Sequence, residues 1–263
     1  MAEWIRSSGR EVRGKSFLEV GTGRTLDLPT GLWLCGASHV MTVDLHPYLS
    51  AALVRESVRF LREHRDEVVK LFGAEAGDQQ FRERFERLVN FGGSLGELLR
   101  LISVEYVSPA DAARLDVPAH SFDFQVSYTV LEHIPPDVIS AILAEARRVL
   151  VPGGLLLHLI DPSDHFSHDD KSITAVNFLQ FSEREWDRLA GNQFMYHNRL
   201  RAYEYLELFE HAGARLIRQR QATDEASLRA LEGNFRLHEN FRHVEREKLA
   251  VCGITILGDF PGE

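Results

Sequence analysis

Residues 15–23, Lys-Ser-Phe-Leu-Glu-Val-Gly-Thr-Gly, form a short apolar run that stops at a glycine turn. An apolar run of this length, bounded by turn residues, predicts a buried strand. Glycines at such a turn let backbone N–H groups approach a ligand closely and let the chain bend without Cβ clashes. The stretch therefore predicts the first strand of an α/β fold, with a ligand-binding turn at its end.

The rest of the chain alternates strand and helix patterns. The clearest helix starts at Pro135-Pro136, has apolar residues three and four positions apart, and is expected to stop at Pro152-Gly153-Gly154. Strand patterns occupy 39–43, 121–127, 155–160, 214–217 and 249–257. Strands that alternate with helices predict a doubly wound α/β fold with a mostly parallel sheet.

Two segments exceed what a minimal fold of this class needs. Residues 49–100 have helical patterning where one crossover helix would suffice. Residues 163–200 are rich in histidine and aromatic side chains, including Phe194, and contain a Ser182–Glu185 capping box. We expect a single domain over 1–263, with a helical insertion at 49–100 and an acceptor-site or lid insertion at 163–200.

The composition is that of an ordinary globular protein. Of 263 residues, 44% are apolar and 26% charged, and the net charge is -9. No apolar run approaches the ~18 residues of a membrane span, and two cysteines inside apolar stretches suggest buried free thiols. Free thiols lead us to expect a cytoplasmic protein. The acidic net charge disfavours a nucleic-acid surface, so we expect the protein to act on small molecules.

The glycine turn has an acidic partner at the end of the second strand. Asp44 lies 21 residues after Gly23, where a carboxylate accepts hydrogen bonds from a ribose diol. A dinucleotide fingerprint would have a third glycine where Leu26 stands, and Glu19 would repel a pyrophosphate. Glu19 suits a cationic group such as an amino-acid ammonium. These charges favour S-adenosylmethionine over NAD.

Five segments in order resemble the motifs of class I S-adenosylmethionine-dependent methyltransferases, and the resemblance runs from about residue 15 to residue 160. The segments are 19–23, 44–45, 108–115, 121–134 and 150–154. The resemblance implies a Rossmann-like sheet with an antiparallel last strand, S-adenosylmethionine as cofactor and S-adenosylhomocysteine as product. It implies cofactor contacts for Glu19, Gly21, Thr22, Gly23, Asp44, Leu45, Asp111, Ala112, Tyr128 and Thr129. Alternative interpretations stay open for Asp111 as a helix cap and for Glu132 as a scaffolding carboxylate.

The segment 161–170 is the candidate acceptor site, because six of its ten residues are Asp or His and it directly follows a strand. His165, assisted by Asp161 or Asp164, is the leading candidate for a base that removes a hydroxyl proton. His133, after the preceding strand, is a second candidate for the base or a scaffolding residue. A divalent metal held by Asp and His is possible but not favoured, and a solvated polar loop is the third interpretation.

The favoured function is methyl transfer to a hydroxyl of a small acceptor, a sugar or glycoconjugate precursor. The segment 161–201 is similar to methyltransferases encoded with bacterial polysaccharide synthesis. Two alternatives stay open: an NAD(P)-dependent oxidoreductase, and a methyltransferase-like protein without catalysis. Enzymes that methylate exocyclic amines of nucleic acids have an Asn/Asp-Pro-Pro-Tyr/Phe motif where this chain has Ser127-Tyr128-Thr129-Val130. Methylation of such amines is therefore not expected.

Overall fold

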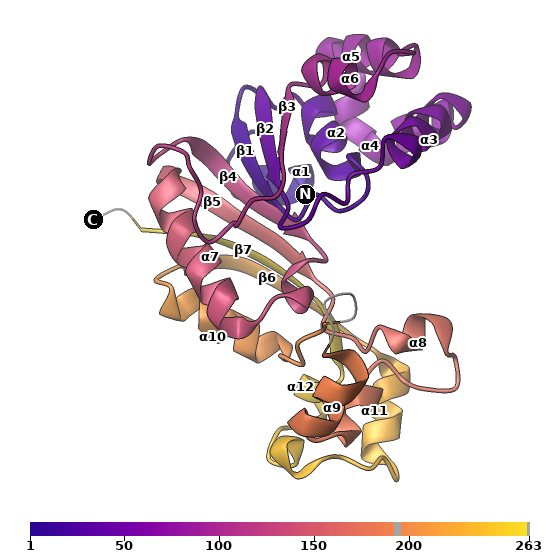
Figure 1. Ribbon diagram of the computed structural model, residues 1–263, viewed down its shortest axis with the longest axis vertical. Coiled ribbons are helices and arrows are strands. Elements are labelled where there is room, and N and C mark those ends of the chain that lie inside the picture. Colours follow the sequence, from indigo (N-terminus) through magenta and orange to yellow (C-terminus); the bar gives the residue numbers. More distant parts are fainter. Residues whose placement is uncertain (192–195, 262–263) are drawn as a thin grey trace. The chain divides into compact units, whose positions relative to one another are not determined.

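The computed structural model describes residues 1–191 and 196–261. The chain divides into two compact units, one of residues 1–126 and 145–155 and the other of residues 127–144 and 156–263 (Figure 1). The prediction of a single domain is not tested by this division. Phe194 lies outside the described residues.

The first unit holds β1, the strand that residues 15–23 predict, and the strands beside it. Phe17 of β1 and Phe124 of β4 stack with ring centroids 4.6 Å apart. β1 pairs in parallel with β2 and with β4, and β2 pairs in parallel with β3. Its elements are α1 (Ala2–Ser7), β1 (Ser16–Val20), α2 (Asp27–Leu34), β2 (His39–Val43), β3 (Val104–Val107) and β4 (Phe122–Tyr128), whose last two residues belong to the second unit.

Helices fill residues 49–100 of this unit, and capping side chains explain where three of them begin. Ser50 accepts a hydrogen bond from the Leu53 amide, Asp78 from the amides of Gln80 and Phe81, and Ser94 forms a capping box with Glu97. The helices are α3 (Ala51–Glu63), α4 (Arg65–Phe72), the 3₁₀ turn η1 (Gly73–Gly77), α5 (Gln79–Val89) and α6 (Leu95–Leu101).

The second unit begins with the 3₁₀ turn η2 (Leu131–His133) and most of α7 (Pro136–Val149). The predicted capping box of Ser182 and Glu185 is present at the start of α9. The remaining elements are the end of β5 (Leu150–Ile160), α8 (Phe166–Asp169), η3 (Asn177–Gln180), α9 (Glu183–Ala190), α10 (Ala202–His211), β6 (Arg215–Thr223), α11 (Glu225–Glu232), η4 (Glu239–Phe241), α12 (Arg246–Leu249) and β7 (Val251–Asp259).

The seven strands follow the order β3-β2-β1-β4-β5-β7-β6, and the last strand, β7, pairs antiparallel with β6. The sequence-based prediction of a doubly wound, mostly parallel sheet with an antiparallel last strand is confirmed. The edge strand β3 was not predicted, because it has four residues and only its first is buried.

The segment Pro152-Gly153-Gly154 corrects one prediction. It does not separate α7 from a strand, since α7 ends at Val149 and β5 starts at once at Leu150. Gly153 has φ of +72°, and a Cβ on Gly154 would lie 2.9 Å from the Val151 carbonyl oxygen. Glycine is therefore needed at these two positions near the start of β5. A side chain would be strained at position 153 and would clash at position 154.

A separate apolar core holds the helices of residues 163–200 within the second unit. Phe178 and Trp186 pack edge to face with centroids 5.6 Å apart, and the indole N–H donates to the His197 carbonyl oxygen. Leu231, Leu249 and other buried side chains complete this core.

Two further expectations can be compared with the structure. Cys35 and Cys252 are free thiols, as expected, but both are half-buried instead of fully buried. Among the described residues, no helix is long and apolar enough to cross a bilayer.

Candidate functional site

The glycine turn after β1 is held by the end of β2. Gly21 has φ of +84° and Gly23 has φ of +65°, which only glycine adopts without strain. The Gly21 amide donates to the Val43 carbonyl oxygen at 2.8 Å, and the Gly23 amide donates to Asp44 Oδ2 at 2.9 Å. A Cβ on Gly23 would meet no atom within 4 Å, so the space beside this turn is open.

Glu19 is a buried carboxylate at the end of β1, with only 3% of its surface exposed. The Thr42 hydroxyl donates to it in a short hydrogen bond, and the Thr22 and Thr42 hydroxyls lie 2.7 Å apart. Burial, together with the nearby charges of Asp44 and Asp27, raises the pKa of Glu19 to about 8, although the hydrogen bond from Thr42 acts in the opposite direction. A cation placed beside this carboxylate would offset its desolvation.

The segment with Asp111 adjoins the end of β2, because the Ala110 amide donates to the Asp44 carbonyl oxygen at 2.9 Å. Asp111 accepts from the Ala113 amide at 2.9 Å and so shapes a turn, and no helix follows it. The alternative interpretation of Asp111 as a helix cap is therefore wrong. Ala112 is buried, and Leu45 is 61% exposed. The structure thus brings Asp44 and the Asp111 segment together.

Tyr128 and Thr129, the last two cofactor candidates, belong to the second unit. Tyr128 is 57% exposed and ends β4. Thr129 has φ of +51°, and its amide donates to the Leu159 carbonyl oxygen. These two residues turn the chain sharply at the carboxyl end of β4.

Four histidines gather in the second unit. The ring of His165 lies 4.9 Å from that of His133, 4.8 Å from that of His168 and 4.4 Å from that of His197. Asp161 Oδ2 lies 3.7 Å from Nε2 of His165 and 3.6 Å from Nε2 of His168. The two loops that follow β4 and β5 therefore place His133 and His165 together with Asp161, as the sequence predicts. We call His133, His165, His168, His197, Asp161 and Glu132 the histidine cluster.

Two histidines of this cluster, His165 and His197, are held neutral. Burial lowers the pKa of His197 to about 2 and lowers the pKa of His165, and the neighbouring imidazoles act in the same direction. His133 Nδ1 lies 3.0 Å from the Tyr196 carbonyl oxygen, which can only accept, so Nδ1 carries the hydrogen. The free lone pair of His133 is therefore on Nε2.

Asp164 is used for local structure. Its carboxylate accepts from the Phe166 amide at 3.0 Å and from the Asn177 side chain at 3.4 Å. Its side chain is completely buried, and burial raises its pKa. These contacts fix the turn that carries His165.

Sequence analysis missed two buried residues that hold the loops of the histidine cluster. The Asn198 side chain donates to the carbonyl oxygens of Leu131 and Ile134, both at 2.8 Å. Arg201 is fully buried and donates to the Pro162 and Val251 carbonyl oxygens. Their partners are distant in sequence, so no local pattern could have revealed these contacts.

Comparisons with known proteins agree with this fold. Residues 93–158 match the methyltransferase domain family. A search of curated proteins finds no significant match. Three similar structures are methyltransferases. One, an S-adenosylmethionine-dependent methyltransferase from Methanosarcina mazei, shares 16% identity over 98% of both chains, with a TM-score of 0.54.

The second, an S-adenosylmethionine-dependent methyltransferase from Mesorhizobium loti, shares 15% identity over 98% of both chains, with a TM-score of 0.53. The third, the magnesium protoporphyrin IX methyltransferase of Synechocystis PCC 6803 with bound S-adenosylhomocysteine, shares 10% identity. It matches 98% of this chain and 79% of its own, with a TM-score of 0.50. These similarities show that the chain has the fold of the S-adenosylmethionine-dependent methyltransferases and that residues 93–158 resemble a methyltransferase domain.

The ends of β1 and β2 fit the cofactor of such enzymes. The buried Glu19 suits the ammonium group, the open turn at Gly23 leaves room for a ligand, and Asp44 retains lone pairs for ribose hydroxyls. These assignments remain proposals for the individual residues.

The raised pKa of Glu19 leads to a testable prediction. Below pH 8 the free carboxyl is protonated, and it must ionise to pair with the cofactor ammonium. Cofactor binding should therefore release close to one proton at pH 7, and affinity should rise up to about tenfold per pH unit between pH 6 and 7. Calorimetry with S-adenosylhomocysteine in buffers of different ionisation enthalpy measures this release.

The matched variant for this prediction is Glu19→Gln, which keeps the shape and removes the titration. It should bind more weakly and release no proton. Equal proton release by the variant and the unaltered protein would show that another group titrates.

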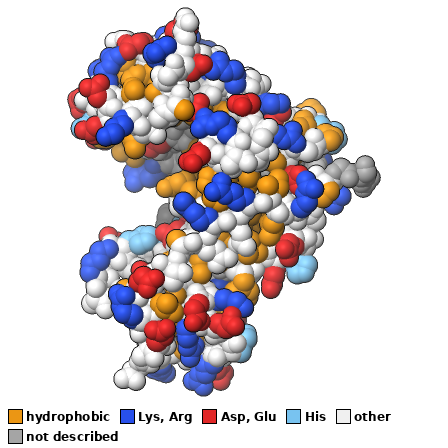
Figure 2. Space-filling view, turned by 180° about the vertical axis from the view of Figure 1, so that it is seen from behind, with side chains coloured by type: hydrophobic (Ala, Val, Ile, Leu, Met, Phe, Trp, Pro, Cys, Tyr) orange, Lys and Arg blue, Asp and Glu red, His pale blue; other side chains and the backbone are white. Residues whose placement is uncertain are grey.

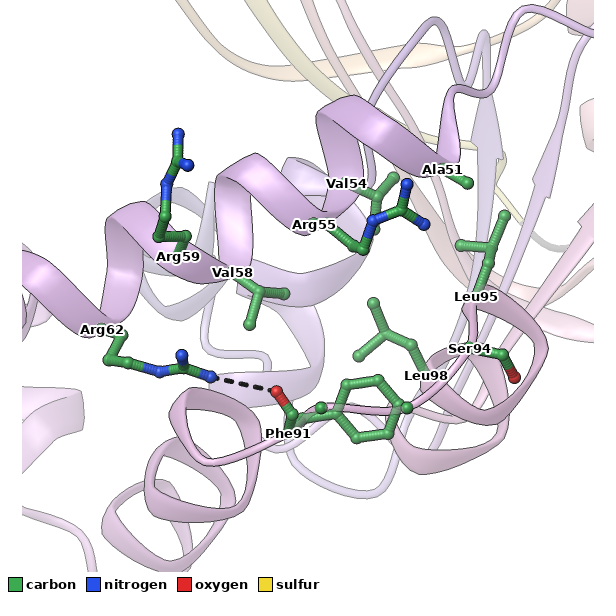
Figure 3. Close-up of a pocket in the computed structure, with 12 residues that line it drawn as sticks. Ala51, Val54, Arg55, Val58, Arg59, Arg62, Phe91, Ser94, Leu95 and Leu98 are labelled. Carbon is green, nitrogen blue, oxygen red and sulfur yellow. Dashed lines mark hydrogen bonds between the residues drawn. The ribbon is translucent and has the colours of Figure 1, made fainter.

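A separate cavity of about 200 Å³ lies in the first unit between α3 and residues 91–98 (Figure 3). Val54, Val58 and Leu98 point into it, and Arg62 closes one end by donating to the Phe91 carbonyl oxygen at 3.1 Å. None of the residues proposed above for the cofactor or the acceptor lines this cavity.

Proposed function

We propose that the protein transfers a methyl group from S-adenosylmethionine to a hydroxyl of a small, hydroxylated acceptor, a sugar or glycoconjugate precursor. The observation that carries the proposal is the histidine cluster, in which His165, an imidazole kept neutral by burial, lies beside the Asp161 carboxylate. A hydroxyl must lose its proton to become a methyl ether, and neutral imidazole is suited to accept it near pH 7.

Each part of the chain has a distinct task in this proposal. When bound, S-adenosylmethionine supplies an electrophilic methyl group, and its displacement depends mainly on alignment. Glu19 and Asp44 hold the cofactor, and the pair of His165 and Asp161 is central to proton removal. Asp161 lies 3.7 Å from His165 Nε2, near enough to stabilise an imidazolium. His133, with its lone pair on Nε2, orients the acceptor or shares the proton, and Asp164 fixes the turn.

The surface charge supports a small acceptor. The chain has a net charge of -9, and acidic and basic side chains are intermixed on the face shown in Figure 2. A nucleic-acid enzyme would be expected to carry a continuous basic stripe that pairs with phosphates. Polar groups of the histidine cluster, in contrast, match the hydroxyls of a sugar.

The proposal is tested by incubating the protein with methyl-labelled S-adenosylmethionine and a panel of sugars and nucleotide sugars. We expect label in a product that survives alkali, because methyl ethers are stable to base and methyl esters are hydrolysed. Label only in amine-containing acceptors, or only in an alkali-labile product, would contradict transfer to a hydroxyl.

A further inference from the structure

Glu132 is the most unusual polar residue of the histidine cluster. Its side chain is completely buried, and among the described residues neither carboxylate oxygen makes a hydrogen bond. The amides of Glu132 itself and of Asp161 face the carboxylate without reaching hydrogen-bond geometry. A buried carboxylate with no partner is costly unless it is protonated or a cation compensates it.

Two histidines offer nitrogen donors to the same point. One oxygen of Glu132, one ring nitrogen of His133 and one of His165 all lie within 4.8 Å of one another. A tetrahedral ion with bonds of about 2.0 Å sets its donors about 3.3 Å apart. Side-chain movements on the order of 1 Å would therefore close these three donors around one ion.

The surroundings of the two histidines match those of metal ligands. A metal-bound imidazole usually donates its second N–H to a carbonyl or carboxylate, which fixes the ring and its tautomer. His133 Nδ1 donates to the Tyr196 carbonyl oxygen at 3.0 Å and leaves Nε2 free. Asp161 stands near His165, with Oδ2 3.7 Å from Nε2. The ring of His133 is thus oriented by a group outside the three donors, and Asp161 lies close to the ring of His165 without a hydrogen bond to it.

We propose that Glu132, His133 and His165 bind one divalent first-row transition-metal ion of the Zn²⁺ type. Two imidazoles and one carboxylate favour such ions over Mg²⁺ or Ca²⁺, which prefer sites made of oxygen alone. The sequence suggested only a scaffolding role for Glu132 and did not favour a metal ion. This assignment gives Glu132 a role as a metal ligand.

A neighbouring set of donors, Asp161, His165 and His168, is the weaker candidate. Its donor atoms also lie within 4.8 Å of one another. Asp161 already accepts from the Ser163 amide at 3.0 Å, and His168 lies 3.3 Å from the Ser163 hydroxyl. Asp161 and His168 thus already have polar partners, whereas the carboxylate oxygens of Glu132 have none among the described residues.

The role of the ion rests on the proposed function, although its binding does not. Three protein ligands leave coordination positions open for oxygens of the acceptor. Coordination would lower the pKa of the hydroxyl that is methylated. With His165 as a ligand, His168 beside Asp161 would take the hydroxyl proton in place of His165, and the oxygen would form its new bond to the methyl carbon as S-adenosylhomocysteine leaves.

The test is a calorimetric titration of the chelator-treated protein with Zn²⁺, with Co²⁺ absorption spectra as a second measurement. We expect one ion per chain. Glu132→Gln keeps the volume of the side chain and should weaken Zn²⁺ binding by at least about 100-fold, because loss of even an outer-shell partner costs ~10–100-fold. His168→Ala should change Zn²⁺ affinity less than about tenfold, and the exposed His211→Ala, on α10, should leave it unchanged.

Two outcomes would overturn the assignment. One is the absence of saturable Zn²⁺ binding, and the other is binding that Glu132→Gln preserves and His168→Ala abolishes. The same samples are titrated with S-adenosylhomocysteine. Cofactor binding without Zn²⁺ binding refutes the metal site alone, and Zn²⁺ binding without cofactor binding refutes the methyltransferase proposal alone.

Discussion

Replacement of His165 by alanine is expected to lower kcat for methyl transfer by about 10²–10⁴-fold. His165 lies at the centre of the histidine cluster, in ring contact with His133, His168 and His197. The variant loses the imidazole whether it acts as proton acceptor or as metal ligand. Affinity for S-adenosylhomocysteine should change little, because the cofactor contacts proposed for β1 and β2 are untouched.

The matched control is Asp169→Asn, which alters an exposed carboxylate four residues along the same segment. We expect this control to retain full turnover. Steady-state kinetics and a cofactor titration are measured for both variants. Turnover of His165→Ala within threefold of the unaltered protein would remove His165 from the reaction.

Replacement of Asp44 by alanine is expected to weaken cofactor binding by about 100-fold. Hydrogen bonds from ribose hydroxyls to a charged acceptor are worth roughly 1.5–3 kcal/mol each, and one such bond lost at the middle of that range accounts for most of the effect. The change also frees the Gly23 amide, which donates to Asp44 Oδ2 at 2.9 Å. Calorimetric titration with S-adenosylhomocysteine measures the loss.

Two further variants show whether the loss of affinity in Asp44→Ala comes from the missing carboxylate. Asp44→Asn keeps one oxygen acceptor and should lie between alanine and the unaltered protein. Asp116→Ala removes an exposed carboxylate elsewhere and should have no effect. Equal affinity of Asp44→Ala and the unaltered protein would show that the ribose is not held at the end of β2.

The parts of the fold that sequence could predict are those decided by local pattern. β1, β2 and β4 are buried apolar runs bounded by turns, and their positions were predicted to within one or two residues. β3 escaped prediction because Glu105 and the half-buried Tyr106 interrupt its apolar pattern at the edge of the sheet. The start of β5 was misplaced because Gly153 and Gly154 were interpreted as a helix stop.

The candidate site shows the same division between local and distant causes. Asp161 and His165 could be proposed from their position after a strand. The burial of Glu132 could not, because it depends on residues far along the chain: the Asn198 amide donates to the Glu132 carbonyl oxygen at 2.8 Å. A glutamate after a strand is usually solvent-exposed, so only the folded structure reveals its isolation.

Both the function and the residue roles proposed for this chain depend on binding of the methyltransferase cofactor, which calorimetric titration with S-adenosylhomocysteine measures. We expect saturable binding at one site per chain, weakened by Asp44→Ala and accompanied by proton release that Glu19→Gln abolishes. Titration without saturable heat, under conditions where the protein is folded, would contradict this expectation.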